Sequence, residues 1–89
     1  MEKKSNKNSR NQILDLVVED IADIFMQDNK GFDRADVIKR YRFYLSKEST
    51  RKKTIAWLRD KQKKTSLVYR KMHIENIITL INVAYKKMF

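Results

Sequence analysis

The sequence predicts a single, mainly helical domain that also contains a short β segment. Apolar residues recur at helical spacing over residues 12–27 and again over 74–88, and the chain holds one glycine and no proline, the residues that most often interrupt helices. With 89 residues and no cysteine, the chain can bury one small core and forms no disulfide. We expect three to four helices with a minor β element, and an all-α bundle is the alternative.

Residues 1–11 contain one apolar residue, the initiator Met1, and are predicted to form a flexible basic arm before a domain over residues 12–89. Such an arm could follow DNA phosphates or act as a solubilising tail.

In the helix predicted over residues 12–27, one apolar stripe faces away from a row of acids. The stripe consists of Leu14, Val17, Val18, Ile21, Ile24 and Phe25. Gly31 suits the turn that follows.

Asp33 is the predicted N-cap of a helix over residues 34–43, with Asp36 three residues later. A further helix is predicted over residues 49–62, and the short break before it places the two helices at a steep angle. Trp57 lies near the outer edge of this helix, where it is either partly buried against a neighbouring element or free to stack on a base.

Residues 61–71 allow two interpretations. The β-favouring side chains at 67–69 predict a short strand, which would form a wing together with the basic residues before it. Alternatively, helix continues over residues 59–72. The last predicted helix, residues 74–88, has an apolar face wider than half its circumference, so it is either central to the domain or a seam between two copies of the chain.

The net charge of +10 is distributed unevenly along the chain. Residues 1–30 have a net charge of −1, residues 31–60 of +5 and residues 61–89 of +6. Such crowding of positive charge raises self-repulsion, which a polyanionic partner relieves. We expect double-stranded DNA as that partner. An anionic membrane is disfavoured, because the basic residues and the strongest apolar stripe lie on different segments.

The composition argues against an enzyme. The single histidine, His73, has no cysteine to pair with and cannot form a zinc site alone, and one glycine cannot build a phosphate-binding loop. We expect no catalytic residue, cofactor, metal ion or small-molecule substrate. No apolar run approaches the roughly 18 residues of a membrane span, and no secretory signal is visible, so a cytoplasmic location is expected.

The helix predicted over residues 49–62 is the expected DNA-contacting element. Its first turn combines free backbone N–H groups with hydroxyls and three cations, which suit phosphates and base edges in a major groove. Basic residues over 61–71 would contact the flanking phosphates. The expected DNA-binding residues are Ser49, Thr50, Arg51, Lys52, Lys53, Thr54, Lys61, Lys63, Lys64, Arg70 and Lys71.

The succession FDRADVIKRY, a short turn, STRKKTIAWLRDKQ, KKTSLVYRK and a terminal helix resembles a winged helix-turn-helix domain over about residues 12–89. The resemblance implies a recognition helix that begins with residues 49–54. It implies wing contacts from Lys61, Lys63, Lys64 and Arg70.

We therefore predict a non-enzymatic protein that binds double-stranded DNA. Its expected use is as a transcriptional regulator, or as a plasmid or phage accessory factor at an origin of transfer or replication. A homodimer through the C-terminal helix would suit repeated half-sites. The alternative is a protein-interaction module that docks through the apolar face of residues 74–89.

Overall fold

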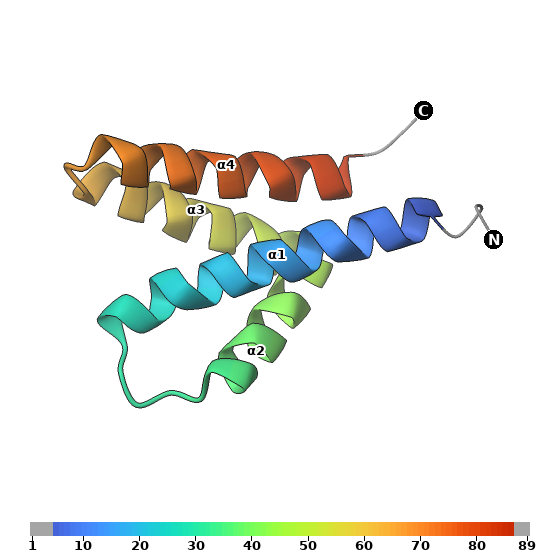
Figure 1. Cartoon of the computed structure of the whole chain (residues 1–89), viewed down its shortest axis with the longest axis horizontal. Coiled ribbons are helices and arrows are strands. Elements are labelled where there is room, and N and C mark those ends of the chain that lie inside the picture. The colour runs from blue at the N-terminus through green and yellow to red at the C-terminus, as the bar shows by residue number, and fades with distance from the viewer. Residues whose placement is uncertain (1–4, 87–89) are drawn as a thin grey trace.

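The computed structural model describes residues 5–86, with side chains from residue 12 onward, and this part of the chain forms four helices and no strand. The helices are α1 (Ser5–Asp28), α2 (Arg34–Ser46), α3 (Glu48–Lys64) and α4 (Val68–Tyr85), as Figure 1 shows. The prediction of a mainly helical domain is confirmed.

Helix α1 begins earlier than the sequence predicts. The backbone of residues 5–11, which were expected to belong to a flexible arm, continues the helix predicted over 12–27, and residues 1–4 lie outside the described residues. Once a helix is nucleated, each added residue forms one further backbone hydrogen bond at little cost. A polar segment can therefore extend a helix that an apolar stripe anchors further along.

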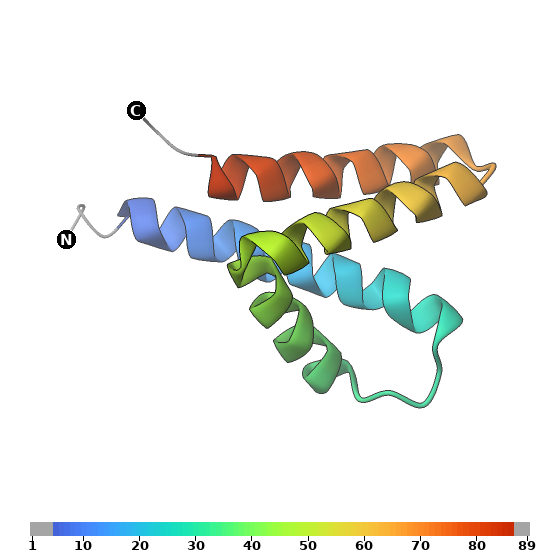
Figure 2. The same ribbon diagram turned by 180° about the vertical axis from the view of Figure 1, so that it is seen from behind.

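The four helices pack around one core. Helices α3 and α4 lie side by side and run in opposite directions, while α1 packs against α2 and α4 (Figure 1). Helix α2 is shorter, packs against α1 and α3, and meets the start of α3 at a steep angle (Figure 2).

The core consists of the apolar stripes of all four helices. Its buried side chains are Val17, Val18, Ile21, Ala22 and Ile24 from α1, Val37, Tyr41 and Leu45 from α2, Leu58 from α3, and Ile74, Ile77, Ile78 and Ile81 from α4. The stripe predicted for residues 12–27 is confirmed, with Leu14 and Phe25 partly buried against the core. The isoleucines of α4 lie at the centre of the domain, which confirms one of the two positions predicted for this helix.

The connection between α1 and α2 has the turn and cap that the sequence predicts. Gly31 has a φ of 93°, a conformation that side chains other than glycine disfavour. Asp33 is the N-cap of α2, and its carboxylate accepts a hydrogen bond from the Asp36 N–H at 3.3 Å. Arg34 then pairs with Asp23 at 3.0 Å, which fixes the start of α2 against α1.

The predicted strand at residues 67–69 is wrong, because α4 begins within it at Val68. The Lys71 N–H donates to the carbonyl of Leu67 at 3.0 Å and closes the first turn of the helix. One continuous helix over residues 59–72 is also wrong, since three residues separate α3 from α4. A strand needs a partner strand for its backbone groups, and the described chain supplies none, whereas a helix satisfies these groups locally.

Candidate nucleic-acid interface

One side of the first two turns of α3 faces the interior of the domain. Thr54 is only 5% exposed, and its hydroxyl donates to the carbonyl of Thr50 at 2.9 Å. The Thr50 hydroxyl in turn donates to the carbonyls of Tyr44 and Lys47, at the end of α2. This burial and hydrogen bonding argue against the DNA contact predicted for the Thr54 side chain. Thr54 lies one helical turn after Thr50, on the side of the helix that faces the core.

Arg51 joins three helices. Its Nη1 donates to the carbonyl of Leu45 at 2.7 Å, and its guanidinium lies 4.0 Å from the centre of the Tyr85 ring on α4. The last carbonyls of a helix lack partners within that helix, so Arg51 satisfies one of them at the end of α2. A phosphate contact by Arg51 would have to use the guanidinium N–H groups that do not bind Leu45.

The opposite side of α3 is exposed. Ser49, Lys52 and Lys53 point outward, as predicted, and Lys52 lies 3.5 Å from Glu48 in a pair four residues apart. Among the described residues, Lys53 has no acidic side chain at ion-pair distance. Lys63 follows three helical turns after Lys52 and lies on the same side.

Two cations of the predicted basic flank bind helix α1. Lys61 forms an ion pair with Asp28, and Arg70 donates to the side-chain oxygen of Gln27 at 2.7 Å. The hydrogen bond from Lys61 lowers the pKa of the Asp28 carboxyl below its usual value, so the pair is charged at neutral pH. These two residues fasten the start of α4 and the end of α3 to α1.

The remaining cations of this flank are exposed. Lys64 pairs with Asp60 on its own helix at 3.0 Å. Lys63 and Lys71 have no acidic side chain at ion-pair distance among the described residues. Exposed pairs four residues apart are worth only about 0.3–0.5 kcal/mol, so Lys64 can exchange its partner easily.

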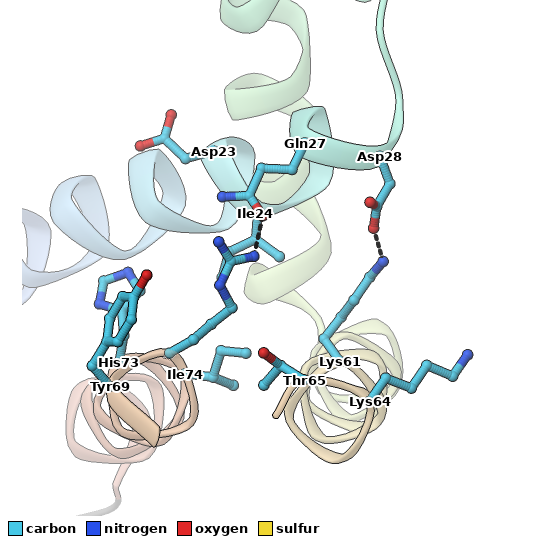
Figure 3. A pocket seen from close by; sticks show the side chains of 11 residues that line it. Asp23, Ile24, Gln27, Asp28, Lys61, Lys64, Thr65, Tyr69, His73 and Ile74 are labelled. Atoms are coloured by element: carbon cyan, nitrogen blue, oxygen red, sulfur yellow. Dashed lines mark hydrogen bonds and ion pairs between the residues drawn. The ribbon is translucent and has the colours of Figure 1, made fainter. Parts of the chain in front are cut away.

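A cavity of about 490 Å³ lies where the end of α1 meets the end of α3 and the start of α4. Lys61 reaches Asp28 on one side of it, while Tyr69 and His73 lie next to each other on the α4 side (Figure 3). Lys64, on the α3 side with Lys61, extends away from the cavity (Figure 3). Sequence reasoning missed this cavity because its walls come from three separate helices.

A second hollow, of about 350 Å³, lies between α2 and α3 and is lined by aromatic rings. Trp57 is half-buried and stacks on Tyr41, with ring centres 5.8 Å apart, and Tyr44 packs edge-on against Tyr41. The prediction of partial burial for Trp57 is therefore confirmed. Lys53 also lines this hollow, so the exposed cation stands beside aromatic surface that the sequence did not place there.

Within the described residues, no three His, Asp or Glu side chains lie close enough together to hold a metal ion. None of the described helices is both long and apolar enough to cross a bilayer. Comparisons with models of protein families, with curated proteins and with solved structures found no match for this chain. The charge and geometry of its own residues are therefore what bears on its function.

Proposed function

We propose that this protein binds double-stranded DNA, without catalysis, through the outer side of α3 and the α3–α4 connection. The observation that carries the proposal is the exposure of Lys53, Lys63 and Lys71, which have no acidic partner among the described residues. A lysine without a partner can approach a phosphate without first giving up an ion pair. Each such contact releases counterions from the duplex, which is the main source of sequence-independent affinity.

The ion pairs formed by the acidic side chains of α1 support the same surface as the DNA-binding one. Acidic side chains of α1 would repel phosphate, and three of them are bound by cations of other helices. These pairs are Asp15 with Arg42, Asp23 with Arg34, and Asp28 with Lys61. The lysines without an acidic partner, Lys53 and Lys63 on α3 and Lys71 at the start of α4, lie where an anionic partner would be attracted.

Helices α2 and α3 would serve as the helix-turn-helix pair of this proposal. Only Lys47 separates them, and they meet at a steep angle (Figure 2). The basic side chains on either side of the α3–α4 connection would take the place of a β wing in contacting the flanking backbone. We propose the use of such a protein in transcriptional regulation, or at a plasmid or phage origin of transfer or replication.

A homodimer through α4 remains a prediction. The isoleucine stripe that suggested it lies in the core, so a seam would have to use the outer side of the helix, where Val83 is 54% exposed. Sedimentation at high micromolar concentration would test the dimer, and a monomer there would contradict it.

A salt titration tests DNA binding directly. Fluorescence anisotropy with a random-sequence duplex should show an affinity that falls steeply with salt, with a log–log slope of roughly −5 if about six phosphates are neutralised. A docking module for another protein would show little salt dependence. No binding of duplex in dilute buffer would contradict the proposal.

A further inference from the structure

Four apolar side chains are exposed where the α3–α4 connection leads into α4, one from the connection itself and three from the first five residues of the helix. Leu67 is 44% exposed, Val68 69%, Tyr69 68% and Met72 61%. The α3–α4 connection and the start of α4, which carry these residues, lie at one extremity of the molecule (Figure 2). Val68, Tyr69 and Met72 lie within five residues at the start of α4, and exposed apolar side chains grouped beside polar ones are typical of a binding surface.

The start of α4, which carries three of these side chains, is tied to α3 by hydrogen bonds. The side-chain amide of Gln62 on α3 donates to the Lys71 carbonyl and to the Glu75 carboxylate on α4, both at 3.0 Å. Arg59 donates to the same carboxylate. The apolar side chains are therefore presented on a fixed turn, and little ordering entropy would be lost when they enter a partner.

The rim of this patch is basic. Lys63 and Lys71 flank the apolar residues in the sequence and have no acidic partner among the described residues, whereas the nearby acids Asp60 and Glu75 are paired with Lys64 and Arg59. The matching partner has to be negatively charged at its edges and apolar between them. Stacked base pairs bordered by two phosphate backbones have both properties.

We propose that Leu67 and Val68, backed by Met72, form an apolar wedge that enters the minor groove between two base pairs and kinks the duplex. Lys63 and Lys71 hold the phosphates on either side of the wedge. Val68 and Met72 are one helical turn apart and lie on the same side of α4. This inference rests on the proposed DNA binding and adds that the bound duplex is bent. The expected kink is about 20–90°.

The deformation should depend on the base step that is opened. Pyrimidine–purine steps such as TA unstack easily, whereas A-tracts are stiff. We expect the protein to bind a duplex of about 30 base pairs with a central TA step with about tenfold higher affinity than one with a central A-tract. This preference requires no hydrogen bond between a side chain and a base.

The test uses the whole chain and a duplex with dyes at both ends and 2-aminopurine beside the central TA step. The unsubstituted protein should raise energy transfer between the ends, which reports bending, and raise 2-aminopurine fluorescence, which reports unstacking. The double variant Leu67→Ser/Val68→Ser should bind with the same salt slope and lose both signals. Leu16→Ser is the matched control, because Leu16 is 62% exposed on α1 and should leave both signals intact.

The outcomes separate this inference from the proposed function. Duplex binding with the same bending in the double variant overturns the wedge and leaves DNA binding in place. No duplex binding by the unsubstituted protein overturns both. Binding to vesicles of phosphatidylglycerol and phosphatidylcholine that the double variant loses and Leu16→Ser keeps would assign the patch to a membrane surface, and would also overturn the wedge. Circular dichroism checks that the variants, which change exposed positions, remain folded.

Discussion

Arg51 reaches back across the α2–α3 junction and donates a hydrogen bond of 2.7 Å from its Nη1 to the carbonyl of Leu45. Leu45 is buried, at 1% exposure, so the bond is anchored in the core. Together with the bonds from Thr50, it ties the first turns of α3, which carry Ser49, Lys52 and Lys53, to the end of α2. Arg51, although it lies in the most basic stretch of α3, thus has a structural role at the candidate interface.

Replacing Arg51 by alanine should therefore destabilise the domain. The variant Arg51→Ala loses a charge-assisted hydrogen bond and the contact with the Tyr85 ring, and we expect the free energy of unfolding to fall by about 1.5–3 kcal/mol. Urea unfolding followed by circular dichroism measures this change. Lys52→Ala is the control, since Lys52 is exposed and pairs only with Glu48, and it should change stability by less than about 0.5 kcal/mol. Equal effects of the two substitutions would contradict the structural role of Arg51.

Removing two lysines without acidic partners should weaken duplex binding more than removing two others. The variant Lys53→Gln/Lys63→Gln should reduce the steepness of the salt slope by about 2, because each phosphate contact contributes about one. Lys30→Gln/Lys39→Gln removes the same charge from exposed positions outside α3 and α4 and should leave the slope nearly unchanged. Anisotropy titrations at several salt concentrations distinguish them. A similar loss in both variants would mean that total charge, and not this surface, determines binding.

Acid should destabilise the fold through two carboxylates. Hydrogen bonds from Gln62 and Arg59 lower the pKa of Glu75, and the one from Lys61 lowers the pKa of Asp28. A carboxyl group with a lowered pKa in the folded state binds fewer protons there than in the unfolded chain, so stability rises with pH over that interval. The contribution is complete above the usual values of 4.5 for Glu75 and 3.8 for Asp28, and it is lost as the pH falls through the lowered values.

Urea midpoints measured between about pH 3 and pH 7 test this dependence. Glu75→Gln should flatten the acid limb, whereas Glu48→Gln, which removes only an exposed pair with Lys52, should leave it unchanged. Asp20 changes the stability in the opposite direction as the pH falls, because burial raises its pKa. An acid limb unaffected by Glu75→Gln would show that the contacts of this carboxylate add no stability.

Gly31→Ala should destabilise the domain through the backbone alone. Gly31 has a φ of 93°, and a Cβ added there would meet no atom within 4 Å, so the cost comes from the conformation and not from a clash. We expect a loss of about 1–2 kcal/mol in the free energy of unfolding, measured by urea titration. Gly31→Asn should lose less, since asparagine tolerates positive φ better. An unchanged midpoint for Gly31→Ala would mean that the turn relaxes to negative φ.

Local features of the fold could be predicted from the sequence. The N-cap at Asp33 and the turn at Gly31 depend on neighbours within a few residues, and so do the apolar stripes of α1 and α4. The strand predicted at residues 67–69 failed for the opposite reason, since β propensity has an effect only where a partner strand is present. Helix α4 took two of those three residues into its first turn.

The sequence by itself determined that the chain is helical, that it is strongly basic, and that its positive charge gathers in the last sixty residues. Only the tertiary structure decided which of those cations are exposed without an acidic partner. Lys61 is bound to Asp28, 33 residues away, whereas Lys63, two positions later, faces solvent. The physical reason is that helix periodicity acts over a few residues, whereas an ion pair between helices forms only after the core has set how they pack.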